Sequence, residues 1–359
     1  MDTVPSDPSR ARPAARRVTN EYSALARLVR EAGLLRRRYG YYWTRLVLAV
    51  LAFGGIWVAV AIVGNSWWQL VLAAAMAVVV TQIAFLGHDS AHRQIFRSRA
   101  WNDWTARVLA GGFVGLSYGW WRTKHEQHHS APNQEGQDPD ISPGVIAFTP
   151  AALAARTGWR SWFARHQGWF FFPLLTLEGL NLHVASVRTV LRRGSVPHRG
   201  VEAPLVLGRL VVYVGVLVLL LPPGKAAAFL GVQLAVFGVL LGGSFAPNHK
   251  GMPIVPPGVT LDFLRRQVLI SRNVRGGYAV DAVMGGLNYQ IEHHLFPSMP
   301  RPNLKKVRPI VHSYCEDVGV PYTEVGLFRS YGIVVRYLNR VGLRAQEPFT
   351  CPLAASLGR

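Results

Sequence analysis

Four long stretches of the chain consist almost entirely of apolar residues, and they occur as two closely spaced pairs. Apolar side chains face every side of each stretch, which is typical of a helix in lipid rather than of a surface helix with one apolar face. A helix of about 20 residues is about 30 Å long, enough to cross the hydrocarbon core of a bilayer. The pattern predicts an all-α integral membrane protein with four transmembrane helices in two hairpins. These helices lie at about residues 43–64, 67–87, 204–222 and 224–247.

Other segments are helical in pattern but not suited to crossing a bilayer. Residues 105–118 are apolar but too short to cross, so we expect them to lie in the membrane interface or to dip in and return. Residues 169–187 contain Glu178, Asn181 and His183, which argue against a full span. Beyond Pro297, the pattern predicts an amphipathic cytosolic helix. The fold is therefore expected to combine the two hairpins with interfacial helices and a cytosolic helical cap that carries the histidines discussed below.

The distribution of charge predicts which side of the membrane is cytoplasmic. The formal net charge is +20, and arginines are concentrated before the first apolar stretch. The turn at residues 65–66 has no charge and the turn at residues 222–225 has one lysine. By the positive-inside rule both turns face outward and both termini are cytoplasmic, in a bacterial inner membrane. Because orientation accounts for the charge and no recognition motif accompanies it, nucleic-acid binding is not expected.

The polar ends of the chain suggest three regions. Residues 1–40 are predicted to be a basic, partly disordered cytosolic tail, because proline and charge alternate up to about residue 20. Residues 41–328 form the membrane domain, and residues 329–359 form a cytosolic C-terminal tail. Cys315 and Cys351 are too few and too far apart to predict a disulfide framework or a thiolate metal site.

Histidines are concentrated in three short windows. HDSAH (88–92), HEQHH (125–129) and QIEHH (290–294) contain seven of the 12 histidines. In the first two windows the spacing of three or four residues places the rings on one helix face, whereas the adjacent His293 and His294 point about 100° apart and suit two neighbouring centres. All three windows map to the cytoplasmic membrane face, as does His249 at the end of a predicted span. Imidazole binds iron, zinc, copper and nickel, so the windows predict a metal site.

Two other metal sites fit part of the same pattern. HEQHH matches the H-E-x-x-H motif of zinc proteases, with His125 and His129 as ligands and Glu126 as general base. The other clustered histidines would then have no role, because such a zinc needs one more protein ligand. Carboxylate-bridged di-iron bundles need a second E-x-x-H, which is missing. The isolated histidines are expected to be ordinary hydrogen-bonded residues: His166, His183, His198 and His312.

Four motifs together resemble the membrane fatty acid desaturases. They are GHDSAHRQIF, HEQHHSAPN, FAPNHKG and GGLNYQIEHHLFPSMPR, and they match the family's HxxxH, HxxHH and [HQ]xxHH boxes in order, over about residues 40–325. The Gln290 form of the last box is similar to the branch of front-end and linoleoyl-CoA-type desaturases and their bacterial relatives. The resemblance implies a di-iron centre that uses O2 and two electrons to introduce a cis double bond into a fatty acyl chain, as acyl-CoA or acyl-lipid. Related hydroxylases, epoxygenases and ketolases share such boxes and are the near alternative.

The resemblance also implies which residues hold the iron. The box histidines are ligands and His249 is an extra ligand outside the boxes; the implied set is His88, His92, His125, His128, His129, His249, His293 and His294. Gln290 stands where relatives often have histidine, and it either binds metal, holds a water or orients a neighbour.

Acidic and amide residues within the motifs have two possible roles each. Asp89, Glu126 and Glu292 either accept a hydrogen bond from a ligand ring, which fixes its tautomer, or are surface acids. Asn248 and Asn288 either support the ligands or serve as caps and turn residues. The run GQDPDISPG, with Asp138 and Asp140, predicts a turn.

The source of electrons is a separate expectation. Many front-end desaturases carry a fused cytochrome b5 domain with a His-Pro-Gly-Gly motif, and this motif does not occur in the sequence. Electrons are therefore expected from a separate protein, a ferredoxin or a flavoprotein reductase, that docks on the cytosolic face.

Overall fold

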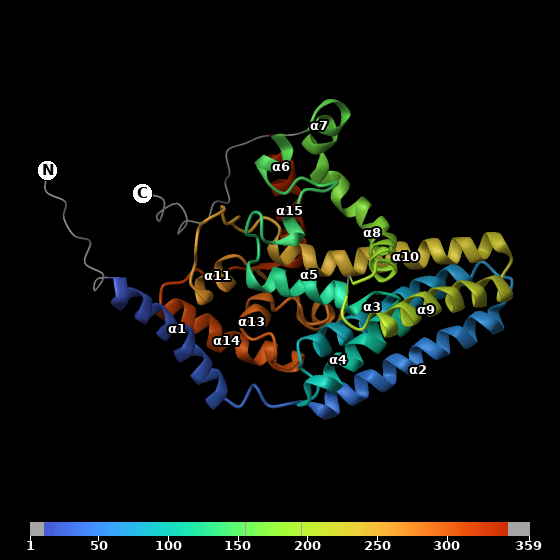
Figure 1. Cartoon of the computed structure of the whole chain (residues 1–359), viewed down its shortest axis with the longest axis horizontal. Helices are drawn as coiled ribbons and strands as arrows, with labels where there is room; N and C mark the ends of the chain where they lie inside the picture. The colour runs from blue at the N-terminus through green and yellow to red at the C-terminus, as the bar shows by residue number, and fades with distance from the viewer. Residues whose placement is uncertain (1–10, 155, 195, 344–359) are drawn as a thin grey trace, which may run out of the picture.

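The computed structural model describes residues 11–154, 156–194 and 196–343, and most of them are helical (Figure 1). Within the described residues, five helices are long and apolar enough to cross a membrane: α2 (Tyr39–Val63), α3 (Gln69–Ala91), α8 (Gln167–Leu191), α9 (Arg199–Leu220) and α10 (Pro223–His249). The shorter helices between α3 and α8 are α4 (Arg99–Arg107), the π-helix η1 (Val108–Val114), α5 (Tyr118–Ser130), the 3-10 helix η2 (Pro139–Ile141), α6 (Pro150–Ala154) and α7 (Gly158–Arg165). The remaining helices are α1 (Ala11–Glu31), α11 (Phe263–Leu269), α12 (Gly277–Val283), α13 (Gln290–Leu295), α14 (Arg301–Asp317) and α15 (Leu327–Gly342).

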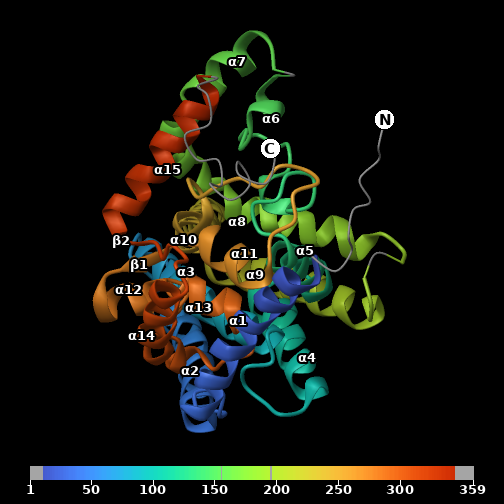
Figure 2. The ribbon, with the colours of Figure 1, turned by 90° about the vertical axis from the view of Figure 1, so that its left-hand side faces the viewer.

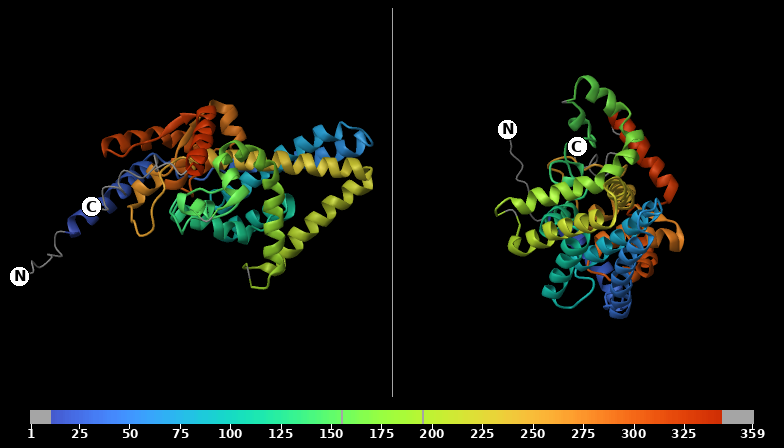
Figure 3. Two further views of the ribbon diagram at one scale, coloured as in Figure 1. Left: turned by 90° about the horizontal axis from the view of Figure 1, so that it is seen from above. Right: turned by 90° about the vertical axis from the view of Figure 1, so that its right-hand side faces the viewer.

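Two helical hairpins, α2–α3 and α9–α10, extend to one end of the molecule, away from α1 and α14 (Figures 1 and 3). The first turn is closed by Gly64, whose φ of 55° suits glycine, and by Gln69, which donates to the Val60 carbonyl over 2.8 Å. In the second turn, the Lys225 ammonium donates to the Asn65 carbonyl over 3.0 Å and so joins the two turns. The hairpins that the apolar pattern predicts are therefore present, with their turns at the same end.

Helix α8 is a fifth helix of span-like length and composition. We expected Glu178, Asn181 and His183 to argue against a full span, and α8 is one continuous helix of 25 residues with span-like hydropathy. Its polar groups have partners: the His183 ring contacts the Gly179 and Val114 carbonyls at 2.6 and 3.1 Å, and Asn181 donates to Glu178 over 3.1 Å. Paired polar groups are tolerated in apolar helices. Among the described residues, the four expected helices are thus present together with one further candidate, α8.

Glycines allow α8 and α10 to pack backbone against backbone. A Cβ on Gly238 of α10 would lie 2.2 Å from the Leu175 carbonyl oxygen, and one on Gly179 of α8 would lie 2.3 Å from the Leu234 carbonyl oxygen. Carbon atoms do not approach oxygen so closely, so neither position accepts a side chain without movement of the backbone. This contact fixes α10, and with it His249 at the end of α10, relative to α8.

The apolar segment at residues 105–118, which we expected in the interface, forms the end of α4 and the short helix η1 rather than a span. Helix α4 continues directly into η1, which ends at Gly115 with a left-handed φ of 91°. Gly111 lets η1 lie close to α9, because a Cβ at this position would lie 3.0 Å from Leu205. The chain then turns into α5, which carries the HEQHH window.

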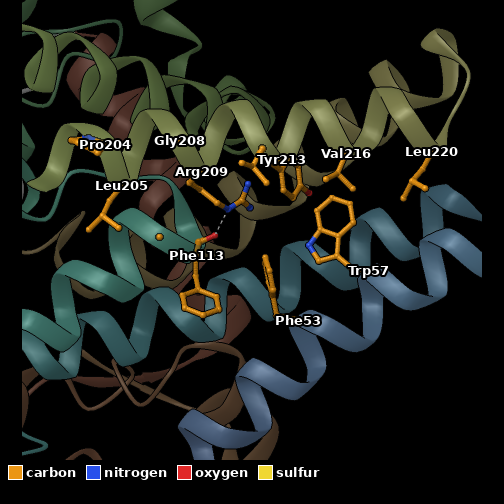
Figure 4. Close-up of a pocket in the computed structure, with 12 residues that line it drawn as sticks. Phe53, Trp57, Phe113, Pro204, Leu205, Gly208, Arg209, Tyr213, Val216 and Leu220 are labelled. Carbon is orange, nitrogen blue, oxygen red and sulfur yellow. Dashed lines mark hydrogen bonds between the residues drawn. The ribbon is translucent and has the colours of Figure 1, made fainter.

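A groove of about 610 Å³ runs between α2, η1 and α9 (Figure 4). Its walls are apolar except for Arg209. The Arg209 Nε donates to the Phe113 carbonyl over 2.8 Å, and the guanidinium lies 3.9 Å from the centre of the Tyr213 ring. Arg209 thus satisfies a carbonyl near the end of the π-helix, which explains a charged residue within an apolar helix.

Part of the N-terminal region is helical. Within residues 1–40, where we expected a partly disordered tail, α1 begins at Ala11; residues 1–10 lie outside the described residues. Leu25 and Val29 of α1 are fully buried against α11 and α14, because the two residues lie on one face of an amphipathic helix. Helices α1, α11, α13 and α14 lie together in Figure 2 and share one apolar core, and we call this group of helices the cap.

The C-terminal part joins the cap to the membrane helices. The helix predicted after Pro297 is present as α14, and β1 (Asn273–Arg275) pairs in parallel with β2 (Glu324–Gly326). Helix α15 then packs against α8. The expected start of the C-terminal tail at residue 329 falls inside α15; residues 344–359, with Cys351, lie outside the described part.

We expect Gly238→Ala to destabilise the protein, because its Cβ would collide with the α8 backbone. Overpacking of this kind costs about 1–3 kcal/mol. Thermal unfolding of the detergent-purified protein measures the effect. Gly231→Ala is the matched control on the same helix, because a Cβ there meets nothing within 4 Å. Equal melting temperatures for the two variants would contradict the close packing.

Candidate metal centre

The first histidine pair lies at the end of α3. The helix continues beyond the apolar run, so that His88 is in its last turn and His92 is its C-cap. The two rings lie on one side with centroids 4.6 Å apart, as the spacing predicts. Arg93 follows with a φ of 57° and turns the chain away from the helix axis. The end of α3 therefore delivers two imidazoles to one place.

The second window lies on α5, and a buried carboxylate fixes the start of that helix. The Ser117 hydroxyl caps α5 by accepting from the Trp120 amide, and it donates to Glu202 over 2.7 Å. Glu202 also accepts from the Gly119 amide over 3.1 Å and pairs with Arg107. A carboxylate at a helix N-terminus satisfies free amides and the helix dipole. Glu202 of α9 thus holds the helix that carries HEQHH.

The third window lies on the short helix α13, next to the end of α10. Gly285 and Gly286 precede it with φ values of 59° and 78°, and a Cβ on Gly285 would lie 2.3 Å from the Phe85 ring. This tight turn brings α13 against α3. His293 and His294 are each 1% exposed. His249 is the last residue of α10 and is also buried.

These four segments bring the predicted ligands into two groups. In each group the candidate ligand atoms lie within 4.8 Å of one another: His88, His92, His125 and His293 in the first, and His128, His249 and His294 in the second. His129 lies between them, with its ring centroid 4.5 Å from that of His125 and 4.2 Å from that of His294. The adjacent pair on α13 therefore serves two neighbouring groups, as predicted.

Hydrogen bonds fix the ring nitrogens of the second group. The Nδ1 atoms of His128, His249 and His294 lie 3.1, 3.1 and 2.9 Å from the Asp138 carboxylate, the Ile270 carbonyl and the Gln267 Oε1, respectively. Each of these oxygens accepts a hydrogen bond, so each Nδ1 carries the proton and each Nε2 has a free lone pair. The three Nε2 atoms are therefore prepared to bind an ion.

The electrostatics keep most rings neutral. Burial lowers the pKa of His125, His293 and His294 well below its usual value, and neighbouring imidazoles lower it further. His128 differs: burial lowers its pKa, but the hydrogen bond and charge of Asp138 outweigh burial, so the pKa of His128 is raised. Neutral imidazole is the metal-binding form.

The donor atoms fit metal ions. Both ring nitrogens of His88 and His293, and Nε2 of His294, are buried without a hydrogen-bond partner in the described part of the chain. Leaving such a group unsatisfied costs about 1–3 kcal/mol. The His92 and His125 Nε2 atoms lie 2.8 Å apart, so either one ring donates a hydrogen bond to the other or both nitrogens bind one ion. An ion in each group satisfies these nitrogens.

The acidic residues of the motifs are placed differently from one another. Asp89 lies 3.6 Å from His88 Nδ1 and forms a buried ion pair with Arg301 at 2.6 Å. Glu292 instead accepts from Asn273 and Tyr322, and burial raises its pKa to about 7. Glu126 is exposed and pairs with Arg122. Among the described residues no hydrogen bond or ion pair joins Glu126 or Glu292 to a histidine.

Of the amide residues, two are near the second group. Gln290 Nε2 lies 2.9 Å from His249 Nε2, and Asn248 donates to Gln290 Oε1 over 3.0 Å. Asn288 donates to Asp281 over 2.8 Å and so supports the turn before α13 rather than a ligand.

The sequence did not reveal two partners of the ligands, Asp138 and Gln267. Asp138 does form the predicted turn, accepting from the Asn133 and Asp140 amides at 2.7 and 2.9 Å. Its contact with His128 depends on the loop folding back onto α5, which the motif does not indicate. Gln267 lies on α11, far from any histidine window in sequence.

Of the isolated histidines, His166 and His183 are hydrogen-bonded, as predicted. His183 contacts two carbonyls, and Nδ1 of His166 contacts the Trp162 carbonyl at 3.0 Å. His312 lies 3.6 Å from Glu316, and His198 lies near Trp104.

Comparisons with known proteins agree with this geometry. Residues 65–326, well over half of the chain, match the model of the family described as fatty acid desaturase. An acyl-lipid (9-3)-desaturase from Physcomitrium patens is 33% identical, over 86% of this chain and 60% of its own length. A delta(8)-fatty-acid desaturase from Helianthus annuus is 25% identical, over 92% of this chain and 75% of its own, and a delta(6)-fatty-acid desaturase from Caenorhabditis elegans is 26% identical, over 92% and 77%. The chain thus spans less than two thirds of the Physcomitrium relative.

We expect Asp138→Ala to weaken metal binding, because it removes the acceptor that fixes the His128 tautomer. Loss of such a partner lowers metal affinity about 10- to 100-fold. Metal content of the purified protein after dialysis against a weak chelator measures it. Glu126→Ala is the control: it lies inside the histidine window but faces solvent, and we expect its metal content to match that of the unmodified protein. If Glu126→Ala lost metal and Asp138→Ala retained it, Asp138 would not be the partner that prepares His128 for metal binding.

Proposed function

The chain belongs to the fatty acid desaturase family, and from this premise we propose that it is a membrane fatty acyl desaturase. It would introduce a cis double bond into a fatty acyl chain with O2 and two electrons. Fatty acyl desaturation is the activity in the printed names of its relatives. These names differ in the position of the double bond, so they support the reaction class and not a position on the acyl chain.

One observation carries the proposal: two groups of histidines lie side by side in a membrane protein. The family is one of di-iron enzymes, and this chain has histidine clusters able to bind metal. We propose that two irons are held by His88, His92, His125, His128, His129, His249, His293 and His294. Bound iron supplies the oxidising chemistry that an unactivated alkyl C–H bond requires, which no acid or base in a protein provides.

The chain's own residues prepare this site in three ways. Burial excludes water from the histidines of α13, which are 1% exposed. Asp138, Gln267 and the Ile270 carbonyl hold three rings in the tautomer that binds metal. Burial and neighbouring imidazoles keep most rings neutral, so they do not have to lose a proton before binding an ion.

The orientation of Glu126 bears on the zinc-protease alternative. A general base in an H-E-x-x-H site faces the metal. Here Glu126 is exposed and forms an ion pair with Arg122 at 2.7 Å. Its orientation therefore favours desaturation over proteolysis, in agreement with the additional histidines that a zinc site would not use.

We further propose a cytosolic centre supplied by a separate electron donor, a ferredoxin or flavoprotein reductase. Helices α1 and α14 share one apolar core, which supports placing the N-terminal region and the metal cap on one side of the membrane. Exposed Arg93 and Arg97 directly follow His92, where an acidic donor finds complementary charge. With both hairpin turns outward, the termini are cytoplasmic, in a bacterial inner membrane.

Expression in a host that lacks desaturases tests the activity. We expect new double bonds in the host's fatty acids, located by gas chromatography and mass spectrometry of derivatised lipids. His293→Ala should abolish them, because it removes a buried candidate ligand, whereas His312→Ala, on the exposed face of α14, should not. Hydroxylated, epoxidised or keto products would instead support the near alternative.

Metal analysis of the purified protein gives an independent test. We expect more than one iron and little zinc per chain, because there are two groups of nitrogen donors. Mass spectrometric elemental analysis measures both metals. A single zinc with no iron would contradict the proposal and restore the protease alternative.

A further inference from the structure

Gln290, the first residue of α13, is buried beside the second histidine group and has two polar contacts. Its Oε1 accepts from Asn248 Nδ2 over 3.0 Å, and its Nε2 lies 2.9 Å from His249 Nε2. The sequence left three roles open for this residue: metal ligand, holder of a water, or support for a neighbour. Which end of the amide faces the histidines decides among them, because only the oxygen of an amide binds metals.

Asn248 fixes the direction of the Gln290 amide. Besides Gln290, the Asn248 Nδ2 faces the Ser244 and Leu287 carbonyls at 3.0 and 3.1 Å. Backbone carbonyls only accept hydrogen bonds, so the Asn248 atom that faces them is its amino group. That group also faces Gln290 over 3.0 Å, and its two hydrogens are shared among the three oxygens. The Gln290 atom that faces it is the oxygen, because a Gln290 amino group in that place would set two donors against each other.

The amino group of Gln290 consequently points at the histidines. An amide nitrogen does not bind a metal, because its lone pair is delocalised into the carbonyl group. His249 cannot satisfy the amino group once metal is present, because the single lone pair of Nε2 then binds the ion. The amino group is left as a hydrogen-bond donor next to the space between His128, His249 and His294.

We infer that Gln290 is not a ligand of the second group but a positioning residue that donates a hydrogen bond to an oxygen or nitrogen acceptor, such as water, dioxygen or azide, in that space. The inference rests on the proposed function, because it needs an ion in the second group. Of the three open roles, Gln290 then has that of holding a water or a similar acceptor. The protein ligands of the second group are three histidines, His128, His249 and His294, with His129 beside them.

Two measurements on the full-length protein in nanodiscs test this role: iron content, and the affinity of the ferric protein for azide from an absorption titration. Gln290→Leu should retain iron as the unmodified protein does, whereas His249→Ala should lose it. Azide should bind Gln290→Leu about three- to tenfold more weakly, because one hydrogen bond is lost. Gln134→Leu is the matched control, because Gln134 is equally a buried glutamine that donates to a carbonyl, that of Val259; it should change neither quantity.

Each other outcome is decisive. If Gln290→Leu loses iron as far as His249→Ala does, Gln290 is a ligand and the inference is wrong. If iron is retained and azide affinity is unchanged, Gln290 donates nothing to the site and the inference is equally wrong. Gln290→Glu, nearly identical in shape, guards against a folding defect of the leucine variant; it should retain iron and weaken azide at least as much, because its carboxylate repels the anion. An unmodified protein without iron would contradict the proposed function instead.

Discussion

The structure depends on placing eight imidazoles together without leaving their nitrogens unsatisfied; six are buried, and His92 and His129 are half-buried. Five of the buried ring nitrogens have no hydrogen-bond partner among the described residues. Burial of so many polar groups is unfavourable unless something else binds their lone pairs. The Nε2 atoms of His128 and His249 face each other at 3.3 Å while both Nδ1 atoms donate to oxygens, so their lone pairs repel each other unless an ion binds them. The arrangement is therefore understandable as a metal centre and difficult to explain as an ordinary protein core.

The remainder of the fold holds four chain segments at this point, and it does so through contacts between residues far apart in sequence. Glu202 on α9 fixes the start of α5. Arg301 on α14 pairs with Asp89 at the end of α3, and its backbone amide donates to Tyr42 and Gln94. Glycine contacts between α8 and α10 fix the helix that ends in His249. Each ligand helix is thus held by a different neighbour, so the positions of the histidines are set by the whole membrane domain rather than by any single helix.

This explains which features the sequence predicts and which it does not. Local patterns predict local structure: the apolar runs indicate the hairpins, and the histidine spacing indicates rings on one face of α3 and α5. Features that depend on a distant partner are not predicted. Helix α8 contains polar residues that oppose a span in isolation, but His183 is paired with Val114 on another element. Glu126 and Asp138 show the same limit. Glu126, inside the motif, lies on the solvent-facing side of α5. Asp138, in the following turn, contacts His128 because the loop folds back onto that helix.

The ligand set has a consequence for the charge of the centre. In both histidine groups every candidate ligand atom is an imidazole nitrogen, and among the described residues no carboxylate is shared by the two. Carboxylate-bridged di-iron sites neutralise much of the metal charge with their ligands, whereas this set does not. The nearest negative charges, Asp89, Asp138 and Asp140, face Nδ1 atoms of the rings. Asp89 is balanced by Arg301, and Asp140 is balanced by Lys124. Because like charges within a low-dielectric site interact strongly, two cations held only by neutral donors would attract anionic oxygen donors into the space between them. The helices α5 and α13, which each contribute histidines to both groups, set the size of that space.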